Sequence, residues 1–66
     1  MRLTVNGDTL DLPALSSVHA LLEHLDLAGK PVVVELNQRA LFPREMEDAP
    51  LQDGDVIELV QITAGG

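Results

Sequence analysis

The fold is decided by residues 2–25, which read RLTVNGDTLDLPALSSVHALLEHL. Over residues 2–6 and again over 9–12, apolar side chains alternate with polar ones, which predicts two half-buried β-strands. Asn6 and Gly7 lie between them, and this dipeptide readily takes the positive φ angles of a two-residue hairpin turn. The first part of the chain is therefore expected to form a β-hairpin.

The hydrophobic pattern changes its period after Pro13, which ends the second strand. Four apolar residues then fall at i, i+3, i+4 and i+7, the spacing of one helix face: Val18, Leu21, Leu22 and Leu25. Ser16 or Ser17 can cap the start of this helix, because a serine hydroxyl accepts a hydrogen bond from a free N–H group. Gly29 is expected to end it, and Pro31 prevents its continuation.

The remaining sequence predicts further strands, at residues 32–37, 40–42 and 56–62. The 45–50 segment is irregular, with room for one helical turn. The apolar start of the 32–37 strand indicates either burial on both faces near the sheet centre or one face offered to a partner. The order is ββαβ(β)β, and the last strand is expected to lie beside the first. This is an α+β β-grasp fold: a mixed sheet of four to five strands packed on one helix.

Composition excludes several classes of protein. The chain has 66 residues, a net charge of −7 and no cysteine, so it has no disulfide and no nucleophilic thiol. Binding to a nucleic acid backbone needs clustered Lys and Arg, and only four such residues are present: Arg2, Lys30, Arg39 and Arg44. No apolar run approaches the ~20 residues that cross a bilayer. We expect no signal peptide, no membrane association and a cytoplasmic location.

The sequence ends in Gly65-Gly66. Glycine has no Cβ, so such residues can pass through a narrow tunnel in another protein and bring a carboxyl group to its active site. We expect a β-grasp domain over residues 1–62 and a flexible tail over 63–66. In this interpretation Gly66 is the reactive residue and Gly65 gives steric access. The alternative is a frayed end, as termini commonly are.

A docking surface is predicted from the alternation of side chains between the two faces of the sheet. In the last strand Glu58 marks one face as solvated, so Ile57 and Leu59 are expected to meet the helix. Val60 and Ile62 then lie outside, and the same argument places Val33 and Glu35 outside on the third strand. Exposed apolar residues next to the tail resemble the core of an interface with a polar rim. We predict a partner-binding patch made of Val33, Val60 and Ile62, rimmed by Glu35 and Glu58.

Other polar residues carry weaker functional signals. His19 and His24 lie roughly 140° apart around the helix, so they do not converge on a metal. Asp53 and Asp55 flank Gly54 and suit a turn better than a calcium loop. Arg44 is expected to brace its loop or to contact a partner. The sequence has no nucleophile, base and orienting group of the kind that a catalyst needs, so we expect a substrate and not an enzyme.

Several short motifs together resemble one family over essentially the whole chain. They are Val34-Glu35-Leu36-Asn37, Phe42-Pro43-Arg44, Leu51-x-x-Gly54-Asp55 and the terminal Gly65-Gly66. In this combination and order they resemble the ThiS family, the ubiquitin-like sulfur carriers of thiamine biosynthesis. The small subunit of molybdopterin synthase, which shares the fold and the tail, is an alternative. So are a ubiquitin-like protein modifier and a plain interaction domain.

The resemblance implies a reaction sequence at Gly66. A ThiF-type adenylating enzyme would use ATP and Mg²⁺ to form an acyl-adenylate on this residue. A persulfide from a cysteine desulfurase system would displace AMP and lead to a thiocarboxylate, and a ThiG-type thiazole synthase would consume the sulfur. No cofactor is expected to stay bound to this chain.

Overall fold

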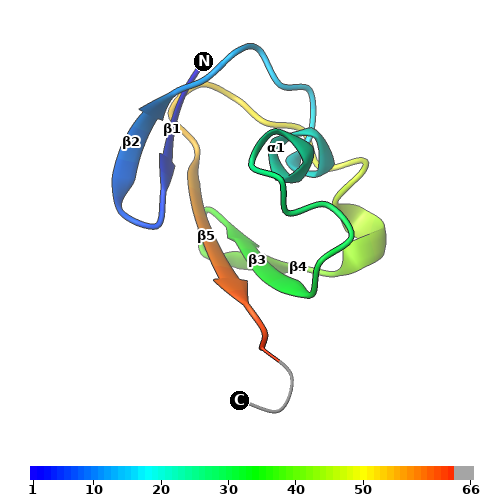
Figure 1. The fold of residues 1–66 in the computed structure, drawn as a ribbon. Helices are drawn as coiled ribbons and strands as arrows, with labels where there is room; N and C mark the ends of the chain where they lie inside the picture. Colours follow the sequence, from blue (N-terminus) through cyan, green and yellow to red (C-terminus); the bar gives the residue numbers. More distant parts are fainter. Residues whose placement is uncertain (64–66) are drawn as a thin grey trace.

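The computed structural model describes residues 1–63 and has a five-stranded sheet with one helix packed against it (Figure 1). The strands are β1 (Arg2–Val5), β2 (Asp8–Asp11), β3 (Val32–Leu36), β4 (Arg39–Leu41) and β5 (Val56–Gln61). Their order in the sheet is β2-β1-β5-β3-β4, with β1 and β5 parallel and the other neighbours antiparallel. The predicted β-grasp fold is confirmed, including the last strand beside the first.

Each predicted strand agrees with the observed one to within a residue at either end. Both hairpin turns have two residues with positive φ angles: Asn6 (50°) and Gly7 (86°) between β1 and β2, and Asn37 (50°) and Gln38 (70°) between β3 and β4. Such turns match the twist of the strands that they join. The first hairpin also carries an exposed ion pair, in which Arg2 Nε donates a 3.0 Å hydrogen bond to Asp11. This bond lowers the pKa of the Asp11 carboxyl.

The helix α1 (Val18–His24) has only seven residues, and its start is held from outside. The Ser17 hydroxyl accepts a 3.2 Å hydrogen bond from the Ala20 N–H, as predicted for one of the two serines. The N–H groups of Val18 and His19 donate to the carbonyls of Ala49 and Met46, each at 3.0 Å. A helix this short is marginal by itself, so these loop contacts and the apolar face stabilise it.

The end of α1 differs from the prediction. The helix ends at His24, five residues before Gly29, because Asp26 takes the left-handed conformation with a φ of 62°. The Asp26 N–H donates to Glu23 at 3.1 Å, and the Leu27 N–H donates to Leu22 at 2.7 Å. This pair of bonds is the Schellman arrangement, with aspartate in the place that glycine usually fills. Gly29 belongs to the next turn.

The core lies between α1 and the inner face of the sheet. The expectation that β3 is buried on both faces is wrong, because Val34 is fully buried whereas Val33 is 43% exposed. Strand β5 holds the sheet centre instead, and the other alternative, an open face on β3, fits the structure. The 3₁₀ turn Pro43–Glu45 provides the helical turn of the irregular segment, slightly earlier than expected. The buried apolar residues are Leu3, Val5, Val18, Leu21, Leu22, Val34, Leu41, Met46, Leu51 and Ile57.

Candidate functional site

The outer face of the sheet, opposite α1, carries exposed apolar side chains near the end of β5. Ile57 is fully buried against the helix, so the alternate residues Glu58 and Val60 point outward. Val60 is 59% exposed, and Ile62, which follows the strand, is 54% exposed. The placement of these side chains agrees with the sequence analysis, while their role in binding stays a prediction.

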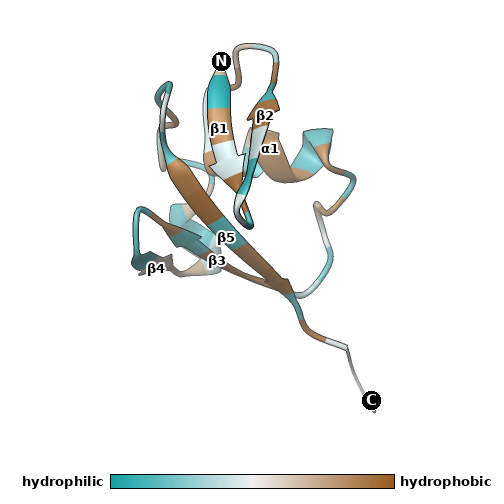
Figure 2. Ribbon diagram, turned by 90° about the vertical axis from the view of Figure 1, so that its left-hand side faces the viewer, coloured by the Kyte–Doolittle hydropathy of each residue, from teal (hydrophilic) through white to brown (hydrophobic). Residues whose placement is uncertain are grey.

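Strand register brings the predicted residues together. Val33 of β3 lies directly opposite Val60 of β5 in the antiparallel ladder. Because Val34 faces Leu41 in the β3–β4 ladder, the same register carried one step further places Phe42 opposite Val33. Figure 2 shows the apolar ends of β3 and β5 lying against each other where the chain leaves the sheet. We call Val33, Phe42, Val60 and Ile62 the apolar patch.

Phe42 was missed as a site residue by the sequence reasoning. It is 64% exposed, the most exposed of the large apolar residues in the described part of the chain. Its neighbour Leu41 is buried. Because successive side chains in a strand point to opposite faces, the alternation along β4 could have predicted that Phe42 is exposed. The Arg44 guanidinium lies 5.5 Å from the centre of the Phe42 ring. Arg44 therefore braces the patch residue next to it, in a cation–π contact.

An acidic pair borders the apolar patch. Glu35 of β3 lies directly opposite Glu58 of β5, and both are exposed. Like charges in directly opposed positions destabilise a sheet. The fold therefore carries an unfavourable pair on the face that the sequence predicts for docking, and a basic group from a partner would relieve the repulsion.

Two asparagine side chains fix β5 in the sheet. Asn6 Nδ2 donates to the Leu59 carbonyl at 3.1 Å, and the Leu59 N–H donates to Asn6 Oδ1 at 2.7 Å. Asn37 Oδ1 accepts from the Val56 N–H at 2.9 Å, and its Nδ2 donates to Asp55 at 3.1 Å. Sequence reasoning assigned Asn6 to a turn, which is confirmed, but missed the contacts of both asparagines with the central strand.

The central strand leads toward the predicted reactive end. The Ile62 N–H donates a 2.9 Å hydrogen bond to the Pro31 carbonyl, so the chain remains fixed to the sheet up to this residue. Gly65 and Gly66 lie outside the described residues. The end of β5 lies at the opposite end of the molecule from the N-terminus (Figure 1). The apolar patch is thus the part of the sheet nearest to the predicted tail.

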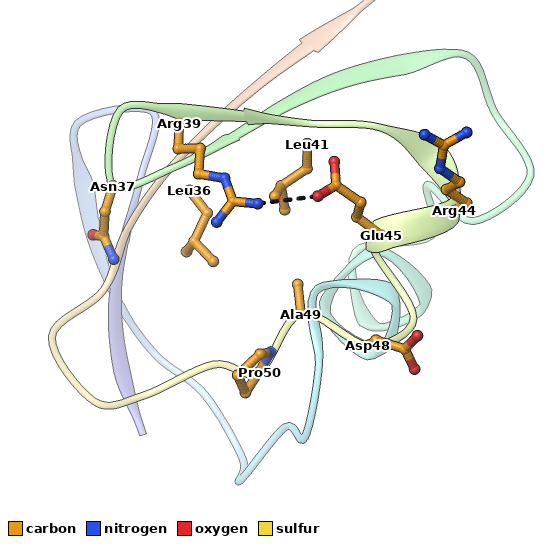
Figure 3. A pocket seen from close by; sticks show the side chains of 9 residues that line it. All are labelled: Leu36, Asn37, Arg39, Leu41, Arg44, Glu45, Asp48, Ala49 and Pro50. Atoms are coloured by element: carbon orange, nitrogen blue, oxygen red, sulfur yellow. Dashed lines mark hydrogen bonds and ion pairs between the residues drawn. The ribbon is translucent and has the colours of Figure 1, made fainter.

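The other polar clusters in the described part of the chain form ion pairs and turns. Figure 3 shows an open hollow of about 720 Å³ beneath β3 and β4, in which Arg39 reaches Glu45 at 3.1 Å while Arg44 points away. Within residues 1–63, no group of three or more His, Cys, Asp or Glu side chains is placed to hold a metal. Asp55 accepts the Gln52 N–H at 2.8 Å, which is the turn role predicted for this loop. None of the described helices is long and apolar enough to span a bilayer.

Comparisons with known proteins agree on one family. The model of the ThiS family matches residues 2–66. The sulfur carrier protein ThiS of Thermus thermophilus is 37% identical over 62 residues, which cover 94% of this chain and 95% of that protein. ThiS of Escherichia coli is 33% identical over the full length of both chains. A crystal structure of the thiamine biosynthesis protein ThiS from Geobacter metallireducens superposes with a TM-score of 0.82, at 35% identity and full coverage of both chains.

A further relative is a larger protein. A thiazole synthase of Paramagnetospirillum magneticum is 32% identical over all 66 residues of this chain, which cover 20% of its own length. The family match over nearly the whole chain, the likeness to two named carriers over at least 94% of each chain and the shared fold confirm the resemblance drawn from the motifs. This chain belongs to the ThiS family, the sulfur carriers of thiamine biosynthesis.

Proposed function

We propose that this chain carries sulfur as a thiocarboxylate on Gly66. The observation that carries the proposal is the course of β5, which ends at the exposed apolar patch, shortly before the terminal Gly65-Gly66 in the sequence. The chain has no cysteine, so it cannot hold sulfur on a thiol side chain. The resemblance to the ThiS family implies that the terminal carboxyl group holds the sulfur instead.

The carboxylate needs activation before it can accept sulfur. It is ionised at pH 7 and is then a poor electrophile. An adenylating enzyme of the ThiF type would use ATP and Mg²⁺ to convert it into an acyl-adenylate, with release of pyrophosphate. A persulfide from a cysteine desulfurase system would displace AMP, and a thiol would then cleave the sulfur–sulfur bond to leave the thiocarboxylate. In this scheme the chain is the substrate and carrier, and its partners supply the catalytic groups.

The apolar patch is proposed as the docking surface for these partners. Its side chains converge on one end of the sheet, as the core of an interface does, and the Glu35–Glu58 pair supplies a charged rim. Glycine has no side chain that a partner could bind, so the affinity has to come from the folded domain next to the tail. The thiazole synthase of Paramagnetospirillum magneticum, which includes a stretch similar to this whole chain, favours a thiazole synthase as one partner.

Intact-protein mass spectrometry tests the proposal. The chain is incubated with ATP, Mg²⁺, the adenylating enzyme and cysteine desulfurase of the same organism, and cysteine. We expect a mass gain equal to the exchange of one oxygen for sulfur, located on the C-terminal peptide. Deletion of Gly66 should abolish the gain, and Gly65→Ala should slow it, both with an unchanged melting temperature. An unchanged mass in the wild-type protein, or sulfur on another residue, would refute the proposal.

A further inference from the structure

Strand β5 extends beyond the strand that flanks it on one side. In the β1–β5 ladder Thr4 pairs with Val56 and Val5 with Ile57, whereas β5 continues to Gln61. Figures 1 and 2 both show the far half of β5 running past the end of the β1–β2 hairpin. On the other side, β3 accompanies β5 along this half, up to the pairing of Val32 with Gln61.

The hydrogen bonds of β5 alternate between its two sides. The Val56 carbonyl and the Ile62 N–H bond to the β3 side, through Asn37 and Pro31. The alternate residues Ile57 and Leu59 turn their main-chain groups to the β1 side. The Ile57 carbonyl accepts from the Asn6 N–H at 2.9 Å, and Leu59 bonds to the Asn6 side chain through both its N–H and its carbonyl.

By the same alternation, the N–H and the carbonyl of Gln61 point to the β1 side, two residues beyond Leu59. No hydrogen bond to either group occurs from that side within residues 1–63, and Gln61 is exposed. Among residues 1–63, the Asn6 side chain is therefore the last group that bonds to β5 on that edge. Beyond it, the described part of the sheet leaves one donor and one acceptor of Gln61 without a partner, in the geometry of a strand.

Such an edge is complementary to an extended peptide backbone. Adding a strand to an open edge gives affinity through main-chain hydrogen bonds and does not depend on the side chains of the segment that is bound. This mode suits the end of this chain, because Ala64, Gly65 and Gly66 offer almost no side chain to recognise. A strand that pairs with Gln61 would also lie next to Val60 and Ile62 of the apolar patch.

We propose that an extended segment of the thiazole synthase pairs with this edge at Gln61 and continues the sheet where the β1–β2 hairpin ends. The proposal rests on the proposed function, which requires the synthase to bind this carrier. The synthase is chosen as the occupant because a stretch similar to this whole chain forms one fifth of a thiazole synthase. The added strand would direct the residues after Gln61 into the active site of the synthase.

Removal of one N–H group tests the edge. Gln61→Pro deletes the N–H that points to the open side and keeps the bonds of Val60 and Ile62 to the β3 side, and proline is tolerated in a strand where its missing N–H faces outward. Gln61→Ala, which removes the side chain and keeps the N–H, is the matched control. We expect Gln61→Pro to weaken binding to the thiazole synthase about tenfold relative to Gln61→Ala, the effect of one main-chain hydrogen bond.

Two results of the affinity measurements would overturn the proposal: equal affinities of the two variants for the synthase, or a loss of affinity confined to the adenylating enzyme. Slow amide exchange at Val60 and Ile62 checks that Gln61→Pro keeps its strand. In the wild-type protein, the Gln61 amide should exchange fast alone and slowly in the complex, and fast exchange in both states would also contradict strand addition. The mass gain at Gly66 is measured in the wild-type protein as well. If it occurs while the binding test fails, strand addition is wrong and sulfur carrying still holds.

Discussion

At the scale of single residues, two asparagines set the geometry of the central strand. Asn6 and Asn37 each adopt a φ of 50° in a hairpin turn, and each directs its side chain to the main chain of β5. Asparagine tolerates the left-handed conformation and offers both a donor and an acceptor, so one residue can serve the turn and the sheet. The partner of Asn6, Leu59, is 53 positions away in the sequence, so no local pattern could reveal the contact.

Replacement of Asn6 by glycine separates these two roles. Asn6→Gly keeps the positive φ and removes both hydrogen bonds to Leu59, so we expect the free energy of unfolding to fall by about 1–3 kcal/mol. Asn6→Asp, which retains an oxygen for the Leu59 N–H, should lose less. Denaturant unfolding measures the loss, and hydrogen exchange should accelerate at the Leu59 amide. Unchanged exchange at Leu59 in Asn6→Gly would show that the side chain does not hold the strand.

At the scale of elements, α1 depends on its surroundings at both ends. Loop carbonyls and Ser17 satisfy the N–H groups of its first turn, and a Schellman arrangement around Asp26 closes its last turn. Asp26 is an imperfect choice at that position. Its left-handed backbone angle costs free energy for a residue with a Cβ, and its negative charge lies near the negative end of the helix dipole.

Asp26→Gly should therefore stabilise the protein. Glycine removes both the conformational cost and the charge, and we expect a gain of about 0.5–1 kcal/mol, seen as a rise of a few degrees in melting temperature. The control Asp26→Ala removes the charge but keeps the Cβ, so it should be less stable than Asp26→Gly. Equal melting temperatures for the glycine and alanine variants would show that the backbone angle carries no cost.

At the scale of the whole molecule, local patterns predicted the elements and the resemblance predicted the chemistry. Two-residue alternations placed every strand to within a residue, because alternation can be recognised from neighbouring positions in the sequence. They also placed Val33, Val60 and Ile62 outside. The position of Phe42 in the patch was not predicted, because it depends on the β3–β4 register. The loop contacts that cap α1 were not predicted either, because they join segments that are distant in the sequence. Gly65 and Gly66 stay predictions from the sequence, supported by the family.

The opposed Glu35–Glu58 pair links stability to binding across the molecule. Glu58→Gln removes a like-charge contact, so we expect it to raise the free energy of unfolding by about 0.2–1 kcal/mol. The same change should slow association with the adenylating enzyme and weaken its dependence on salt, because basic groups of a partner lose one attractive charge. Glu47→Gln, which makes the same charge change in the loop after the 3₁₀ turn, is the control. Equal association rates for the two variants would show that the acidic pair is not part of the docking surface.

Phe42 decides how far the apolar patch extends across the sheet. Phe42→Ser alters a side chain that is 64% exposed, so we expect a small effect on melting temperature, limited to the cation–π contact with Arg44. Its affinity for the adenylating enzyme should fall about tenfold, because an aromatic residue of the apolar patch that a partner buries contributes strongly to binding. Val56→Ser changes another exposed apolar residue on the outer face, four positions before Val60 on β5, and should bind like the wild type. If Val56→Ser weakens binding and Phe42→Ser does not, the partner covers the opposite end of β5 and the assigned patch is wrong.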